Sequence, residues 1–164
     1  MARVASRMSR AGRLLAPTST LAILALGGAC GGGSDQVSAA ELVQKGDSIC
    51  RVERSSFARV QAHPPPNASV AADQTAELIQ ATERANSALR DLEPPDQLRS
   101  PYDRYLEARD RVVAEMKRGR DAAENQDSAV YGAAQAAVAR DAPERHQLAR
   151  ALGLKVCGSS RAGG

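Results

Sequence analysis

Apolar residues recur at alternating spacings of three and four along most of the chain, and prolines or polar runs interrupt them at three places. This spacing puts one apolar stripe on each of several α-helices. The clearest stripe comprises Ala71, Thr75, Leu78, Thr82, Ala85, Leu89 and Leu92. Four such segments joined by short connections predict an all-α domain, folded as an antiparallel up-and-down four-helix bundle.

Start and stop signals define the first predicted helix. Residues 38–41, Ser-Ala-Ala-Glu, form a capping box, and Val37 and Leu42 hold the positions of a hydrophobic staple. The three prolines at 64–66 have no amide donors, so they must end this helix. Cys50 lies on its apolar stripe, so we expect the Cys50 side chain to face the core.

The later helices are bounded less clearly. Pro94 and Pro95 end the second helix, and the third is predicted to start with Ser100 as N-cap. The fourth segment, 128–152, contains Pro143 within Asp-Ala-Pro-Glu, which is itself a plausible capping box, so this segment is either kinked or split there. Gly153 fits a left-handed helix end, after which residues 154–157 can return beside the first helix.

The N-terminus has the order of a secretory signal. Four arginines precede residue 14, an apolar run follows, and small residues lead to Cys30, which predicts a signal peptide over 1–29. Small residues followed by Cys30 resemble a bacterial lipoprotein box. The resemblance implies an acylated Cys30. The residues that follow predict a tether over 30–37, a bundle domain over 38–158 and a disordered tail over 159–164. The alternative is an ordinary secreted protein cut after Ala29, because Leu26 lies one residue further from the cysteine than that family usually places it.

Removing the leader changes the charge and the cysteine count. Four of the 22 Lys and Arg precede Cys30 and all 19 Asp and Glu follow it, which leaves 18 against 19 and a net charge of about −1. A chain of this balance is not expected to bind nucleic acid. Outside the cytosol, Cys50 and Cys157 form an even pair and predict a disulfide. Metal binding and redox chemistry are weaker alternatives, because there is no C-x-x-C and His63 and His146, predicted to be solvated, have no neighbouring ligands. We expect no cofactor.

Four charged residues interrupt the apolar stripes near the middles of their helices: Glu53, Arg109, Asp141 and Arg145. A charge inside a bundle is costly unless it is paired. The four residues could therefore form a buried network beside Tyr105 that fixes register or recognises a small polar ligand. The interpretation that the sequence favours is simpler: they lie at stripe edges, and their stems cover apolar surface.

Between the two cysteines the chain resembles a loose group of uncharacterised exported helical lipoproteins of high-GC Gram-positive bacteria. The residues behind the resemblance are Ser48–Arg51, Leu92–Pro95 with Tyr102 and Tyr105, and Ala151–Gly158. It implies a disulfide-closed helical domain and no catalytic residue. With no catalytic motif in the chain, we expect a non-enzymatic module, held on the outer face of the cell membrane by its lipid, that acts through contacts with an envelope protein. The alternative is a carrier or sensor that binds a polar ligand near Arg109 and Tyr105.

Overall fold

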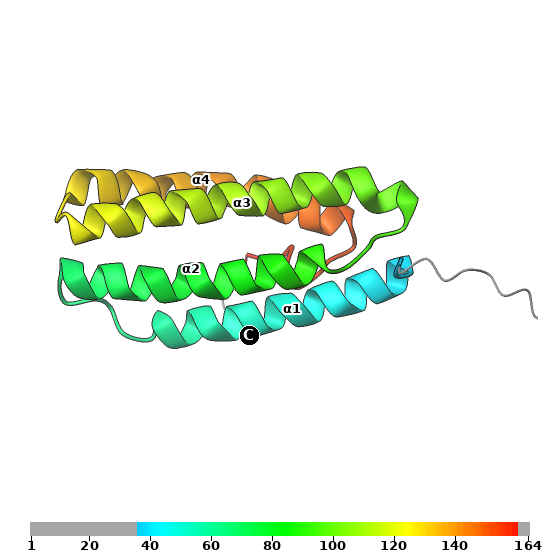
Figure 1. Cartoon of the computed structure of the whole chain (residues 1–164), viewed down its shortest axis with the longest axis horizontal. Coiled ribbons are helices and arrows are strands. Elements are labelled where there is room, and N and C mark those ends of the chain that lie inside the picture. The colour runs from blue at the N-terminus through cyan, green and yellow to red at the C-terminus, as the bar shows by residue number, and fades with distance from the viewer. Residues whose placement is uncertain (1–35, 161–164) are drawn as a thin grey trace, which may run out of the picture. The chain divides into compact units, whose positions relative to one another are not determined.

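Four helices make up the bundle, in a computed structural model that describes residues 36–160. They are α1 (Ala39–Val60), α2 (Ala68–Arg90), α3 (Asp96–Glu124) and α4 (Ser128–Ala151). Consecutive helices run in opposite directions (Figure 1), so the predicted up-and-down bundle is confirmed. The predicted signal peptide, Cys30 and residues 161–164 of the predicted tail lie outside the described residues. None of the described helices is both long and apolar enough to cross a membrane.

The start of α1 is fixed by the predicted capping box. The Ser38 hydroxyl accepts a hydrogen bond from the Glu41 amide at 3.2 Å, and the Ser38 amide donates to the Glu41 carboxylate at 2.9 Å. These bonds satisfy amides that would otherwise lack partners. The Val37 amide donates to the carbonyl of Glu93 at 2.8 Å, and Val37 packs against the core. The ordered domain therefore begins before Ser38, within the predicted tether.

The prediction for the start of α3 was wrong. The helix begins at Asp96 with Pro95 as N-cap in extended backbone, and Pro101 lies inside it. The Leu98 amide donates to the Pro95 carbonyl at 2.8 Å, and the Leu98 side chain packs against the core. Burial of Leu98 favours the extra helical turn, although Pro101 cannot donate a helical hydrogen bond.

α4 is one continuous helix, which decides between the two alternatives at Pro143. Its end is as predicted: Gly153 adopts a φ of 82°, and the Gly153 amide donates to the Arg150 carbonyl at 2.9 Å. The Leu154 amide donates to the carbonyl of Ala149, also at 2.9 Å, and the Leu154 side chain is buried. This pair of bonds is a Schellman motif, which turns the chain back toward α1.

The core consists of separate apolar clusters along the bundle. One surrounds Tyr102, Tyr105 and the disulfide, and contains Leu42, Leu89 and Leu154. We call the second the middle cluster: it comprises Ile79, Val112, Val113 and Met116, with Phe57, Leu78 and Val138 packed against it. α3 and α4 approach closely, since a Cβ at Gly119 would lie 3.3 Å from the Cβ of Ala134.

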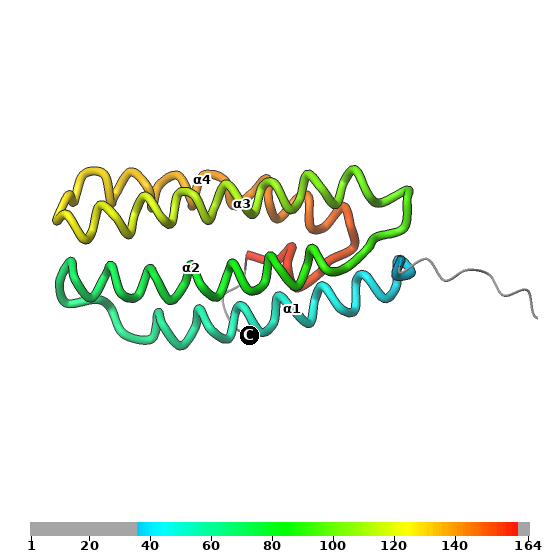
Figure 2. Tube along the Cα trace, viewed as in Figure 1, coloured from blue at the N-terminus to red at the C-terminus, as the bar shows by residue number. Residues whose placement is uncertain are grey.

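The C-terminal segment, residues 152–160, bridges α1 and α4. Close packing joins α1 to α2, α2 to α3 and α3 to α4, and Figure 2 shows the red segment running back along the bundle from the end of α4. The Asp47 carboxylate accepts the Val156 amide at 2.8 Å, and Arg150 donates to the Gly158 carbonyl at 2.8 Å. The predicted disulfide joins Cys50 to Cys157, with Cα atoms 5.4 Å apart. The segment therefore closes the side of the bundle where α1 and α4 do not pack closely.

Candidate ligand-binding cavity

A buried ion pair links α1 and α3 at mid-bundle. Arg109 is 5% exposed, and its Nη2 donates to a carboxylate oxygen of Glu53 at 2.7 Å. Its Nη1 donates to the Tyr105 hydroxyl at 3.2 Å, and the guanidinium also lies over the Tyr105 ring, 5.7 Å from the centroid. Burial lowers the pKa of Arg109, but the contacts with Tyr105 and Glu53 outweigh it and keep the guanidinium charged.

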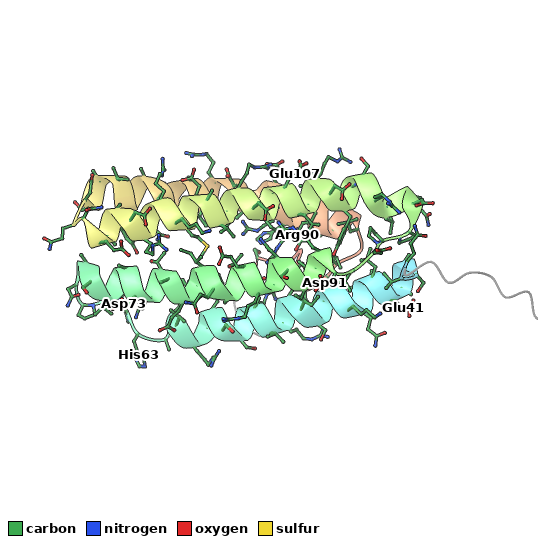
Figure 3. All side chains as sticks on the ribbon, viewed as in Figure 1. Glu41, His63, Asp73, Arg90, Asp91 and Glu107 are labelled. Atoms are coloured by element: carbon green, nitrogen blue, oxygen red, sulfur yellow. A yellow bond between two sulfur atoms is a disulfide. The ribbon has the colours of Figure 1, made fainter. Side chains whose placement is uncertain are left out.

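The same guanidinium connects to α2 through Asn86. The Nε of Arg109 donates to the Asn86 side-chain oxygen at 2.5 Å, and the Asn86 nitrogen donates to Asp110 at 3.2 Å. Arg90, labelled in Figure 3, completes the chain with a bond to Asp110 at 2.5 Å. Each donor group of Arg109 is thus fixed from a different direction, so the guanidinium has one orientation.

Beside this pair lies a cavity of about 300 Å³. All four helices and the C-terminal segment line it, and its charged and imidazole side chains are Glu53, Arg54, Arg109, Arg145 and His146. Ala58 of α1, Gln61 directly after α1 and Gln135 of α4 also line it and are exposed. The mouth of the cavity therefore lies between α1 and α4, where these two helices are not closely packed.

The cationic side chains of the cavity have unequal partners. The Nη2 of Arg54 donates to the carbonyl oxygens of Val156 and Ser159 and to the Ser159 hydroxyl. Ser159 was predicted to lie in the disordered tail, and these bonds hold it in place. Burial, and then repulsion from Arg109, lower the pKa of Arg145. Burial also lowers the pKa of His146, followed by repulsion from Arg145.

The structure brings most of the predicted polar residues together. Glu53, Arg109 and Tyr105 are in direct contact, and Arg145 lines the same cavity. Asp141 is half-buried, does not line the cavity and forms no ion pair within residues 36–160. The favoured interpretation, that these charges lie at stripe edges, is wrong for Arg109 because Glu53 and Asn86 supply it with buried partners.

Sequence reasoning missed two members of the site. Asn86 follows Thr82 by four residues and precedes Leu89 by three, so the spacing of the α2 stripe could have identified it. His146 was predicted to be solvated, yet it is half-buried and lines the cavity next to Arg145 on α4. His63, by contrast, is exposed in the connection between α1 and α2 (Figure 3).

The side chains of this cavity are suited to the recognition of a small molecule. No group of three His, Cys, Asp or Glu side chains in the described part of the chain is arranged to hold a metal ion. Both cysteines at the cavity wall are joined in the disulfide, so neither is a free thiol. A fixed guanidinium, a second arginine and an apolar wall are groups that orient a small molecule.

Comparison of the chain with protein-family models, with curated proteins and with solved structures gives no match. The resemblance to exported helical lipoproteins therefore stays a prediction, and the function has to be argued from the cavity itself.

Proposed function

We propose that this protein is an exported, lipid-anchored helical module that binds a small ligand inside its bundle and is not an enzyme. The observation that carries the proposal is the cavity of about 300 Å³ beside the fixed Arg109 guanidinium. Its volume lies at the lower end of the range for small-molecule sites. A buried charged group with a fixed orientation beside an open cavity is suited to recognition, because no further conformational entropy is lost in ordering it when a ligand binds.

The surface supports ligand binding over protein contacts. A protein-binding module should present a contiguous exposed patch of apolar side chains or tyrosines. Over residues 36–160, the exposed large apolar side chains are Val52 on α1 and Val130 on α4. Both tyrosines of the middle of the chain, Tyr102 and Tyr105, are buried. The cavity is thus the better candidate for the working surface.

The proposal is tested by native mass spectrometry of the mature chain, purified without denaturation from cells that make it. We expect a bound small molecule on the wild-type protein, and its loss from Val138→Phe, which fills the cavity from α4. Val130→Phe, an equal change on the exposed part of the same helix, is the matched control and should keep the ligand. Circular dichroism checks that both variants are folded. Equal ligand occupancy in the two variants, or no bound molecule on the wild type, would refute the proposal.

Membrane anchoring is a separate part of the proposal and rests on the leader and Cys30. Acylation by two or more chains would hold the bundle at the membrane surface. Growth with an alkyne fatty acid, followed by click labelling, should mark the wild-type chain and leave Cys30→Ala unmarked. An unlabelled wild-type chain found in the medium would instead show ordinary secretion.

A further inference from the structure

We infer that the ligand of this cavity is an amphiphilic anion, with a carboxylate or phosphate head held beside Arg145 and Arg54 and an apolar body lying against the middle cluster. The inference rests on the proposed function and names the class of its ligand. It is carried by the charges of the cavity wall and by their order along the bundle.

The wall of the cavity has more cations than anions. Three arginines line it, and Glu53 is the one carboxylate among the lining residues. That carboxylate is bonded to Arg109 at 2.7 Å. Arg54 donates to neutral oxygens of Val156 and Ser159, so these bonds do not neutralise its charge. Neither Arg54 nor Arg145 therefore forms an ion pair with a carboxylate that lines the pocket.

Arg145 has the least complete set of partners. Its Nη1 is buried, and no hydrogen-bond acceptor in the described part of the chain reaches it. Burial, and then repulsion from Arg109, lower the pKa of Arg145, while Tyr105, Glu53 and Asp141 act in the opposite direction. A buried donor without an acceptor is rare and costly in a folded protein. An anion in the cavity would supply the opposite charge that this guanidinium lacks.

The two threonine hydroxyls of the wall are already satisfied by their own helix. The Thr75 hydroxyl donates to the Ala71 carbonyl at 2.7 Å, and the Thr82 hydroxyl donates to the Leu78 carbonyl at 3.0 Å. With these donors engaged, Arg145 is the group that most needs a ligand. This favours an acidic head over a neutral hydroxyl or amide.

The apolar half of the cavity lies to one side of the charged half. On α1 and α3, which run in the same direction, Phe57 follows Glu53 and Met116 follows Arg109. On the oppositely directed α4, Val138 precedes Arg145 by seven residues, a rise of about 10 Å. The apolar residues therefore gather toward the end of the bundle that holds the α1–α2 connection. A ligand that fits this order has its charge at one end and an apolar chain of about 10 Å at the other.

The inference is tested by isothermal titration calorimetry of the folded, oxidised bundle with four octyl compounds. They share one apolar chain and differ in the head: octanoate, octyl phosphate, 1-octanol and octylamine. We expect octanoate or octyl phosphate to bind at least about tenfold more tightly than 1-octanol, the difference that one charge-assisted hydrogen bond makes. The tighter of the two anions identifies the head as a carboxylate or a phosphate. Octylamine should bind most weakly.

Two variants on α4 separate recognition from a structural role. Arg145→Met removes the half-buried guanidinium of the cavity wall, and Arg140→Met removes an exposed one that does not line the cavity. We expect Arg145→Met to lose at least about tenfold in anion affinity while 1-octanol binding is unchanged. Its ligand-free melting temperature should rise, because a half-buried cation with one buried, unpaired donor is removed. A residue with only a structural role would lower that temperature. Arg140→Met should change neither quantity.

Several results would overturn the inference. They are equal binding of octanoate and 1-octanol, tighter binding of octylamine, unchanged anion affinity in Arg145→Met, or no binding of any octyl compound. None of them refutes the proposed function, because the native mass spectrum decides whether the cavity holds a ligand at all. If the native mass spectrum shows no ligand but octanoate binds tightly, the proposed function fails although the preference of the cavity for anions holds.

Discussion

At the scale of single residues, the buried ion pair between Arg109 and Glu53 is expected to contribute strongly to the stability of the folded protein. The two side chains are 6% and 14% exposed. We predict that Glu53→Gln lowers the free energy of unfolding by about 3 kcal/mol, because it leaves the Arg109 cation buried without its counter-charge. Urea denaturation of the two proteins measures the loss. The replacement keeps the size of the side chain, so packing changes little.

A surface pair provides the control for that experiment. Glu144 bonds to Arg111 at 3.2 Å, with side chains that are 62% and 50% exposed. Glu144→Gln should change stability by less than about 1 kcal/mol, because water screens an exposed pair. If both variants lose the same stability, then the Arg109 site is solvated and its role as a fixed recognition group is wrong.

His146 makes stability depend on pH. Its pKa is lowered from the ordinary value of 6.5, by burial and then by Arg145, Arg150 and Arg54. The unfolded chain therefore binds the proton more readily than the folded chain, and stability is lost as pH falls below about 6.5 toward the folded-state pKa. We predict that the melting temperature falls between about pH 8 and about pH 5.5, and that His146→Gln reduces this fall. His63→Gln, in the exposed connection, should leave the fall as it is.

The sequence alone could not assign the buried charges. A stripe position tells which side of a helix faces its neighbours, but a long side chain there can be paired inside or extend to solvent. Arg109 is buried because Glu53, on another helix and 56 residues away, and Asn86 both reach it. Asp141 occupies a similar position in its own stripe and forms no such pair in the described part of the chain. Helix packing decides which of the two charges is buried, and the spacing of apolar residues does not reveal that packing.

At the scale of elements, the end of α4 directs the chain back to α1. Gly153 has a φ of 82°, and a Cβ there would lie 3.2 Å from the Cγ2 of Val43. We predict that Gly153→Ala lowers the free energy of unfolding by about 1 kcal/mol or more, through the left-handed backbone and the crowding of Val43. Thermal or urea unfolding measures it.

Gly132 is the matched control, because it lies in an exposed part of α4 and a Cβ there meets nothing within 4 Å. Gly132→Ala should stabilise the protein by about 0.5–1 kcal/mol, because alanine favours the helix. A gain of stability in both variants would contradict the Schellman geometry at Gly153.

Nearby residues correctly predicted some helix ends and not others. The capping box at Ser38 and the glycine at 153 have side-chain or backbone chemistry that suits one conformation, and both are confirmed. Ser100-Pro101 and the sequence around Pro143 carry equally good start signals, yet both lie inside helices. In the first of these, the extra turn buries Leu98 against the core, and that tertiary gain outweighs the missing hydrogen bond of Pro101.

At the scale of the whole molecule, the cavity exists because the C-terminal segment replaces direct packing between α1 and α4. The spacing of apolar residues predicted the four helices, and the cysteine pair predicted the disulfide. Neither pattern tells how far apart the first and last helices lie. Asp47 and Arg54 hold the segment by bonds to its backbone, and backbone acceptors and donors have no sequence signature. The site therefore arises from the way the four predicted helices assemble.

The disulfide is expected to hold both the bundle and the cavity. It closes a loop with a sequence separation of 107, which stabilises the fold by about 4.7 kcal/mol in the chain-entropy model. We predict that the free energy of unfolding of the double variant Cys50→Ala with Cys157→Ala, measured by urea denaturation, is lower by about 3–5 kcal/mol. A reducing agent should not lower the stability of this variant further.

Reduction of the wild-type protein should also weaken octanoate binding. Both cysteines line the cavity, and reduction releases the segment that carries Cys157. A wild-type protein whose stability and affinity are the same with and without reducing agent would show that Asp47 and Arg54 alone keep this segment in place.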